Sequence, residues 1–405
     1  MPVKLHIVDY AMSDAQAVRL VEQVVNRLPE SEFAVGVVSY GEALARYAAL
    51  ASRLTRPVEL VETPPLGHRF AVARGDEAGY AGRVTHEVLA DTFEAADVIW
   101  FPWVHEHLFD SRAMAKAVVS FHDPAPVEMA EFLADKSDPF GSATCTAMAA
   151  MADMTNRRLT SSLGGVAAAS PRIAAWLTET YAPRLRRPIA IPLPTPSLLE
   201  EVALPVPDLP PHYSLYAGGT APAGNLESLL MAFSRLKSQG RPVLPLALVG
   251  EGTDRIASGG GYREAYIKAL AEHLQIGIGT DLIPLGPLAP GALKTALSGA
   301  AAAIMPLLAE GEGSMMIGQA AELDVSLACS DLPAIRDYCA RRGVQPTWFR
   351  PGVPDEIASA LAGLADAPRA RPAALPDAGW DQVAGSYLTM FREQAILAST
   401  QSGGR

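Results

Sequence analysis

The pattern that most constrains this chain is an alternation of short apolar runs with amphipathic stretches. Runs such as 3–8 and 33–39 have the composition of buried strands, and the stretch 15–28 carries apolar residues at helical spacing. Strands that alternate with helices predict a doubly wound, largely parallel α/β sheet. Further strands of this half are expected at 97–102, 117–121 and 166–170, and a further helix at 171–180.

The alternation stops once, between residues 183 and 211. Nine of the 33 prolines fall in these 29 residues. Because proline removes a backbone donor and disfavours helix at the preceding residue, an extended linker is predicted here. Beyond it the alternation restarts, with strands expected at 213–216, 244–249, 301–305 and 325–328 and helices at 225–237 and 262–274.

The length of the chain agrees with this division, because 405 residues are too many for one ordinary core. We therefore expect an N-terminal Rossmann-like domain over 1–195 and a Pro-rich linker over 196–211. A C-terminal Rossmann-like domain should follow over 212–375. The last stretch, 376–405, has helical character and is expected to pack back on the first domain.

Composition excludes several functional classes. The 33 Lys and Arg against 44 Asp and Glu give a net charge of −11, the opposite sign to a nucleic-acid binder. No apolar run reaches the roughly 18 residues of a membrane helix, and no secretory signal is recognised. Three cysteines cannot build a disulfide framework. A soluble, cytoplasmic protein is predicted, without nucleic-acid partners.

Two Gly-rich segments, 216–225 and 311–318, each lead from a predicted strand into a predicted helix. Such a turn presents backbone N–H groups and the positive end of a helix dipole, which suits phosphate. The second segment lacks the Walker pattern and misses G-x-G-x-x-G at Met316. A tight strand-to-helix turn is the alternative for both segments. Asn225 is a candidate N-cap.

Histidines offer one further candidate. His122 follows a predicted strand, where α/β folds expose ligand-binding groups, although a structural histidine is the alternative. His105 and His107 are spaced as strand neighbours, but no third ligand is near in sequence, so no zinc site is predicted. The chain also lacks the G-x-S-x-G motif of serine hydrolases and any Asp-x-Asp pair.

The order and spacing of several segments resemble the retaining glycosyltransferases of family 4, from residue 212 to 365 and more weakly in the first half. The resemblance implies the GT-B fold, two Rossmann-like domains facing an interdomain cleft. It implies a nucleotide-sugar donor held mainly by the second domain. The matching segments are 5–10, 118–123, 167–170, 216–219, 225–233, 248–252, 285–286, 302–306, 310–313 and 328–334.

The chain departs from the family pattern at several positions, which include Glu312 in place of an aromatic residue and the segment 11–16, which has no glycine. The Arg and Lys that hold the donor diphosphate match Gly219 and Gly224, and the second of two Glu residues matches Gly318. Each lost charge-assisted hydrogen bond costs roughly 1.5–3 kcal/mol of binding. Residues 205–368 hold 11 Lys and Arg against 16 Asp and Glu, so no general positive field compensates. Arg255, Arg263 and Lys237 are the cations that could reach in from elsewhere.

The resemblance implies catalytic roles at the donor sugar for His122 and Glu310. It implies a metal-independent, retaining transfer that uses the nucleotide sugar as substrate and needs no cofactor. The acceptor would be a glycan, protein or lipid-linked molecule in polysaccharide or glycoconjugate synthesis, in the cytoplasm or at the membrane periphery. The expected donor-binding residues are Gly218, Gly219, Gly224, Asn225, Gly286, Gly313, Ser314, Met315 and Gly318.

The missing cations leave a second hypothesis open. A GT-B fold that has lost its donor chemistry would serve as a binding or scaffold subunit, a pseudoenzyme. Such a protein would work as a homo-oligomer or beside a partner glycosyltransferase.

Overall fold

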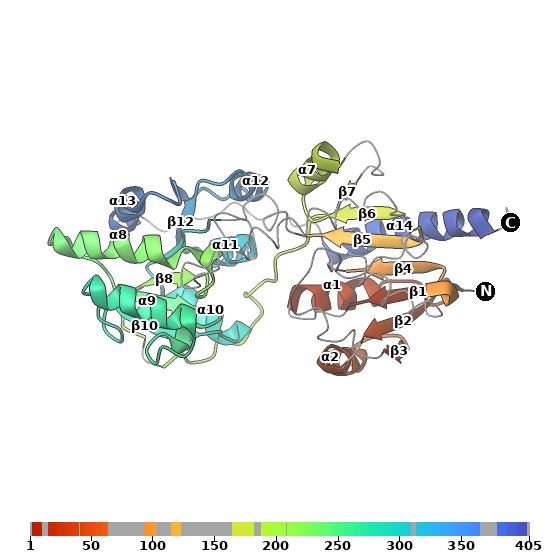
Figure 1. Ribbon diagram of the computed structural model, residues 1–405, viewed down its shortest axis with the longest axis horizontal. Helices are drawn as coiled ribbons and strands as arrows, with labels where there is room; N and C mark the ends of the chain where they lie inside the picture. The colour runs from red at the N-terminus through yellow and green to blue at the C-terminus, as the bar shows by residue number, and fades with distance from the viewer. Residues whose placement is uncertain are drawn as a thin grey trace, which may run out of the picture. The chain divides into compact units, whose positions relative to one another are not determined.

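The computed structural model describes residues 2–9, 15–39, 41–63, 93–102, 115–122, 164–181, 188–207, 209–308, 313–364 and 379–402. They form two compact units, each with its own parallel sheet and core (Figure 1). Unit 1 holds the described residues up to 122, those from 164 to 194, and 379–402. Unit 2 holds those from 195 to 364.

The strands of unit 1 are β1 (Val3–Val8), β2 (Phe33–Ser39), β3 (Glu59–Glu62), β4 (Val98–Phe101), β5 (Ala117–Phe121), β6 (Gly165–Ala168) and β7 (Ile189–Ala190). They form one parallel sheet in the order β3-β2-β1-β4-β5-β6-β7. Leu5 on the central strand is in register with Val35 of β2 and Val98 of β4. The winding direction therefore reverses between β1 and β4.

Helices cover both faces of this sheet. The helices are α1 (Ala15–Val25), α2 (Gly41–Ala51), α7 (Pro171–Tyr181) and α14 (Trp380–Ser402). Residues of α1, α2 and α14 share one apolar core, and residues of α7 lie in the other. On α14, the rings of Tyr387 and Phe391 lie 5.0 and 5.4 Å from that of Trp100 on β4. The C-terminal helix is thus part of the core of unit 1.

The strands of unit 2 are β8 (Ser214–Ala217), β9 (Leu246–Val249), β10 (Leu282–Gly286), β11 (Ala302–Met305), β12 (Ser326–Ser330) and β13 (Thr347–Phe349). Their order is β10-β9-β8-β11-β12-β13, and all pairs are parallel. Tyr216 on β8 is in register with Leu248 of β9 and Ile304 of β11. Here the winding reverses between β8 and β11.

Successive residues of the strands in unit 2 point to opposite faces, and each face is covered. Tyr216 lies in the core under α8 (Leu226–Ser238), α9 (Tyr262–His273) and α13 (Pro354–Leu364), and Leu215 in the opposite core. That core is covered by α10 (Pro290–Gly299), α11 (Gly313–Glu322) and α12 (Pro333–Arg342). These two sheets confirm the doubly wound α/β prediction. Among the described helices of both units, none is long and apolar enough to cross a membrane.

The described part of the proline-rich stretch contains no helix, and its second part is fastened to unit 2. Glu322 of α11 accepts a hydrogen bond from the backbone N–H of Leu198 (2.9 Å), and Lys294 of α10 donates to the carbonyl of Leu199 (2.6 Å). A few residues earlier, Ile191 is buried in the core of unit 1. The prolines therefore restrict a short connection whose two sides are held by different units.

The role of α14 in unit 1 is testable with two substitutions on the same helix. Phe391→Ala removes a fully buried ring and should lower the free energy of unfolding of unit 1 by about 3–5 kcal/mol. The control Ile396→Ala trims a side chain that is 64% exposed and should change it by less than about 0.5 kcal/mol. Denaturant unfolding followed by tryptophan fluorescence measures both. Equal effects of the two variants would contradict the packing of α14.

Candidate functional site

Ligand-binding groups of α/β sheets gather at the carboxyl ends of the strands that flank the reversal of winding. In unit 2 this point lies between β8 and β11, and hydrogen bonds join the loops there. The side-chain amide of Asn225 donates to the carbonyls of Pro306 and Pro351, both at 2.7 Å. The N–H of Leu308 donates to the carbonyl of Ala223 (2.9 Å). Asn225 is the N-cap residue of α8, as expected, but its side chain makes no capping hydrogen bond, because it joins the strand ends instead.

The loop after β8 is closed around the hydroxyl group of Tyr216. This buried hydroxyl donates to the carbonyl of Gly219 (2.8 Å). A Cβ atom at Gly218 would lie 2.7 Å from Cζ of the ring, and one at Gly224 would lie 2.6 Å from the carbonyl of Gly218. Burial and the nearby charge of Glu227 raise the pKa of Tyr216, so the hydroxyl keeps its proton and remains a donor.

Gly219 has a second reason to be glycine. Its φ is +62°, in the left-handed region, and a Cβ atom there would lie 2.9 Å from the carbonyl oxygen of Glu251. A side chain such as arginine would meet both the strain and the clash. Gly219 and Gly224 are thus required by the packing of the loop, which leaves no space for the cations that the family places there.

Gly318 is enclosed in the same way. It lies on α11, and a Cβ atom would run into the hydroxyl of Tyr338 on α12. That hydroxyl shares a 2.7 Å hydrogen bond with Oγ1 of Thr195. A glutamate at position 318 would therefore displace this pair of hydroxyl groups.

The predicted loop 311–318 is only partly a loop, because α11 already begins at Gly313. Gly313, Ser314 and Met315 lie in the first turn of that helix, which carries the positive end of its dipole. The helix begins earlier than expected because its apolar side chains, Ile317 among them, are buried in the core. Glu310 lies outside the residues that the structure describes.

Gly286 joins the same edge from β10. The N–H of Gly250, after β9, donates to the carbonyl of Gly286 (3.0 Å), and the N–H of Gly219 donates to Val249 (3.2 Å). Oγ1 of Thr253 accepts from the N–H of Gly286 (2.9 Å). The structure therefore brings Gly218, Gly219, Gly224, Asn225 and Gly286 together, as the carboxyl edge of β8, β9 and β10.

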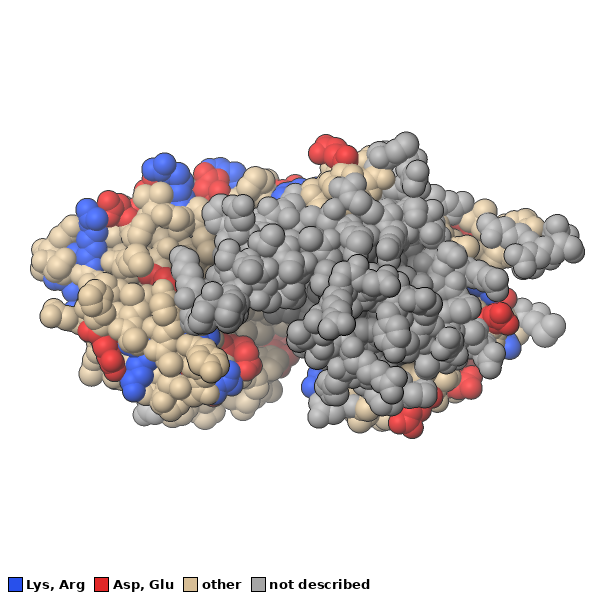
Figure 2. All heavy atoms as spheres, viewed as in Figure 1, with Lys and Arg blue, Asp and Glu red and all other residues tan. Residues whose placement is uncertain are grey.

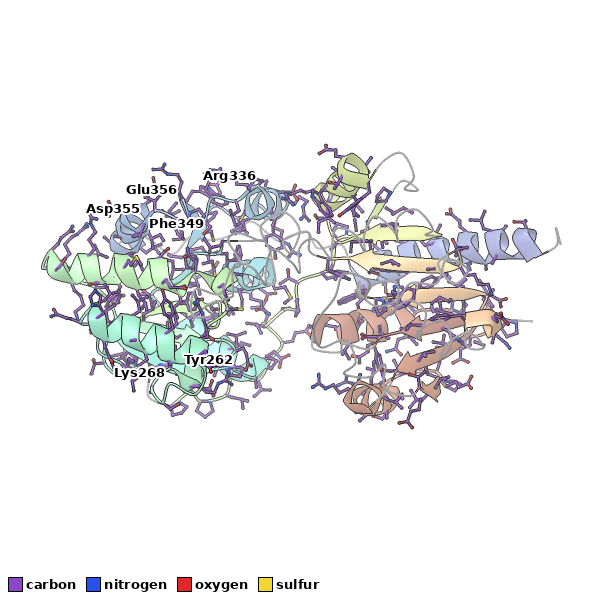
Figure 3. All side chains as sticks on the ribbon, in the orientation of Figure 1. Tyr262, Lys268, Arg336, Phe349, Asp355 and Glu356 are labelled. Carbon is purple, nitrogen blue, oxygen red and sulfur yellow. The ribbon has the colours of Figure 1, made fainter. Side chains whose placement is uncertain are left out.

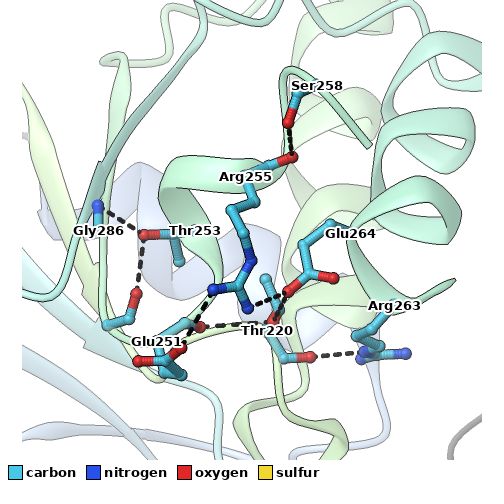
Figure 4. A network of polar contacts seen from close by, with 9 residues as sticks. Thr220, Glu251, Thr253, Arg255, Ser258, Arg263, Glu264 and Gly286 are labelled. Carbon is cyan, nitrogen blue, oxygen red and sulfur yellow. Dashed lines mark hydrogen bonds and ion pairs between the residues drawn. The ribbon is translucent and has the colours of Figure 1, made fainter. Parts of the chain in front are cut away.

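A polar network covers this edge (Figure 4). The guanidinium of Arg255 contacts the carboxylates of Glu264 (3.0 Å) and Glu251 (3.3 Å), and Oγ1 of Thr220 donates to Glu264 (3.3 Å). Burial alone would raise the pKa of Glu264, but hydrogen bonds from its own backbone, Arg255 and Thr220 hold that pKa below the ordinary value. Glu264 is therefore ionised at neutral pH.

Arg263 and Lys237, the other two cations expected to reach the site, each form an ion pair with a carboxylate. Arg263 is buried, donates from Nε to the carbonyl of Thr220 (2.5 Å) and forms an ion pair with Glu227 (2.6 Å). Lys237 forms an ion pair with Asp281 (2.5 Å) near the C-terminal end of α8. Arg263 thus contacts the loop after β8, but its charge is neutralised by Glu227. Lys237 lies near the C-terminal end of α8, away from this loop.

In unit 1, His122 follows β5 at the carboxyl edge of that sheet. Its Nε2–H donates to the carbonyl of Pro102, after β4 (2.8 Å). Burial lowers the pKa of His122 to about 4, and the hydrogen bond to Pro102 offsets only part of this effect. The imidazole is therefore neutral at pH 7.

A buried acid that is not among the residues expected from the sequence lies at the same edge. Asp9 directly follows β1 and is only 1% exposed. It accepts a hydrogen bond from the hydroxyl of Tyr47 on α2 (2.8 Å), and Ser39 donates to its carbonyl (2.5 Å). An acidic residue directly after the first apolar run is the signal that could have found it. Among the described residues of both units, no group of His, Cys, Asp and Glu is arranged to hold a metal ion.

A pair of glycines separates backbone strain from the clash at Gly219. Gly219 and Gly240 have φ values of +62° and +66°, but nothing lies within 4 Å of a Cβ atom at Gly240. Gly240→Ala should cost only the left-handed strain, about 1–2 kcal/mol. Gly219→Ala should cost at least about 1 kcal/mol more, since the Glu251 backbone must move. Urea unfolding measures the difference, and equal costs would refute the close packing.

The state of His122 predicts a pH dependence. Its pKa in the folded chain is below that of an unfolded chain, so its contribution is complete above pH 6.5. As the pH falls toward 4, the unfolded chain takes up the proton first, and roughly 2–3 kcal/mol of unfolding free energy should be lost. His122→Asn should lack this component when stability is measured from pH 7 to 4. An NMR titration that gives a pKa near 6.5 would contradict the lowered pKa of His122.

The sequence matches no family model and no curated protein. Solved structures match in fold. HepE of Anabaena, solved with UDP and glucose, has a TM-score of 0.54 and 12% identity, over 99% of this chain and 100% of that one. A glycosyltransferase of Rickettsia africae has a TM-score of 0.56 and 11% sequence identity, and the match covers 99% of this chain and 97% of that one. OtsA has a TM-score of 0.58 and 10% sequence identity, and the match covers 98% of this chain and 96% of that one. The chain therefore has the GT-B fold of these glycosyltransferases, with two parallel-sheet α/β units.

Proposed function

We propose that the protein is a glycosyltransferase that moves a sugar from a nucleotide-sugar donor to a glycan, protein or lipid-linked acceptor. The observation that carries the proposal is the GT-B fold, in which unit 2 gathers the loops after β8 and β9 and the end of β10 beside the reversal of winding between β8 and β11. HepE has been solved with UDP and with UDP-glucose, so UDP-sugars are the first donors to test.

The chemistry we propose is transfer with retention and without a metal ion. His122 and Glu310 are assigned to the donor sugar by their match to the family motif, with His122 as a neutral imidazole whose Nδ1 can accept a hydrogen bond. The first turn of α11 offers backbone N–H groups and the helix dipole to the departing diphosphate. Those groups would stabilise the negative charge that develops as the sugar leaves.

A second function, that of a pseudoenzyme, is favoured by the glycines at positions 219, 224 and 318. Each is enclosed by neighbouring atoms, so the chain has filled the space that the family's charged side chains need. A protein that lacks those side chains would bind a donor weakly and turn it over slowly, because the charge of the leaving group is less stabilised. It would then act as a binding or scaffold subunit.

Titration with UDP-, GDP- and ADP-linked sugars, by calorimetry, tests the proposal. We expect binding of at least one donor and slow donor hydrolysis, because a retaining site admits water in place of the acceptor. Glu310→Ala should abolish hydrolysis and leave the fold intact, whereas Glu312→Ala, two residues away, serves as the matched control. Binding without hydrolysis or transfer would support the pseudoenzyme. Absence of binding at millimolar concentrations would overturn the glycosyltransferase for these donors and leave the scaffold subunit as the remaining function.

A further inference from the structure

A nucleoside-diphosphate sugar brings two phosphates, which need cationic or N–H donors. The face of unit 2 in Figure 2 shows no large patch of one sign among its described residues, since Lys and Arg alternate with Asp and Glu. Affinity for a diphosphate must therefore come from individual side chains near the edge formed by β8, β9 and β10. The basic residues there differ in how firmly they are already bound.

Most arginines of unit 2 either form ion pairs with carboxylates or lie far from the edge formed by β8, β9 and β10. Arg336 pairs with Asp331 and Arg350 with Glu356, and in Figure 3 Arg336 and Glu356 lie on the opposite side of unit 2 from Tyr262 of α9. Arg263 is buried between Glu227 and the loop after β8, as described above. Arg235 pairs with Asp355 nine residues beyond the start of α8, roughly 13 Å from the edge.

Arg255 is different in both position and exposure. It ends the short turn that follows β9, and Oγ1 of Thr253 fixes this turn through hydrogen bonds to the carbonyls of Leu248 and Gly250, both at 3.0 Å. The backbone of Arg255 is thus held at the edge, while its side chain is 47% exposed.

The two carboxylates that hold Arg255 are unequal. Glu264 is 7% exposed and receives a further hydrogen bond from Thr220, so it is a fixed anchor. Glu251 is 81% exposed and contacts Arg255 at 3.3 Å, as an exposed ion pair that contributes little free energy. One side of the guanidinium is therefore anchored, and the other is held by a partner that is easily replaced.

We infer that Arg255 binds the diphosphate of the donor by exchanging the carboxylate of Glu251 for phosphate oxygens, while Glu264 keeps the guanidinium in place. This inference rests on the proposed nucleotide-sugar donor. A planar guanidinium can give two parallel N–H donors to a phosphate, whereas Glu251 meets it through one contact at 3.3 Å. Once Glu251 has moved into solvent, the charges of Arg255, Arg263, Glu227 and Glu264 cancel, so binding depends on direct hydrogen bonds and is sensitive to Glu251.

Calorimetric titration with UDP and with inorganic pyrophosphate tests this role. Arg255→Ala should weaken binding of both ligands at least about tenfold. Glu251→Gln removes the competing charge without changing Arg255 and should strengthen binding about threefold to fivefold. Arg255→Lys should recover only part of the affinity. The control Arg235→Ala makes the same change of net charge away from the edge and should stay within about twofold of the original protein.

The outcomes separate this inference from the proposed function. If the original protein binds UDP and Arg255→Ala binds it equally well, the role of Arg255 is refuted and the donor class stands. If the original protein binds no nucleotide or nucleotide sugar, both are refuted. A thermal melt of each variant accompanies the titrations, and should Arg255→Ala not fold, the change in affinity of Glu251→Gln decides the matter alone. An unchanged affinity in Glu251→Gln would then overturn the exchange.

Discussion

The hydroxyl group of Tyr216 lies at the centre of the loop after β8, and the packing of this loop determines the structure of the carboxyl edge of unit 2. Because it donates to the carbonyl of Gly219, it draws the loop inward until no side chain fits at Gly218 or Gly224. Asn225, which ends the loop, can then reach the ends of β11 and β13. A single buried hydrogen bond thus explains why two glycines, Gly218 and Gly224, stand where a phosphate-binding protein could have used longer side chains.

This packing also determines how charge is distributed at the edge. With the loop itself uncharged, the nearest cations come from the turn after β9 and from α9, and each arrives beside a carboxylate. Buried pairs such as Arg263 with Glu227 fix the geometry and add no net field. An anion can bind at such an edge only where an ion pair separates to release its cation. The exposed Glu251 separates from Arg255 more easily than the buried Glu264 does.

The alternation of apolar runs was sufficient to predict the α/β class and strands such as β1 and β2, because long buried strands have a strong pattern. It missed β13, a strand of three residues at the edge of the sheet, and α12, where charged residues obscure the apolar face. The glycines of the site were found as a motif. Their packing around Tyr216 and Tyr338 was not, since these contacts join residues whose pairing no local pattern encodes.

An enzyme and a binding subunit with this fold would differ in the stage at which the edge of unit 2 interacts most strongly with phosphate. In a binding subunit that stage is the bound donor, and in an enzyme it is the transfer itself. Groups that bind the diphosphate equally before and during transfer raise affinity without raising the rate. Arg255, anchored by Glu264, meets the diphosphate as soon as the donor binds and belongs to this class. Groups that respond to the charge developing on the leaving diphosphate raise the rate, and in this chain the first turn of α11 is the element suited to that role. In the proposed glycosyltransferase, turnover therefore depends on α11, and donor affinity on the turn after β9.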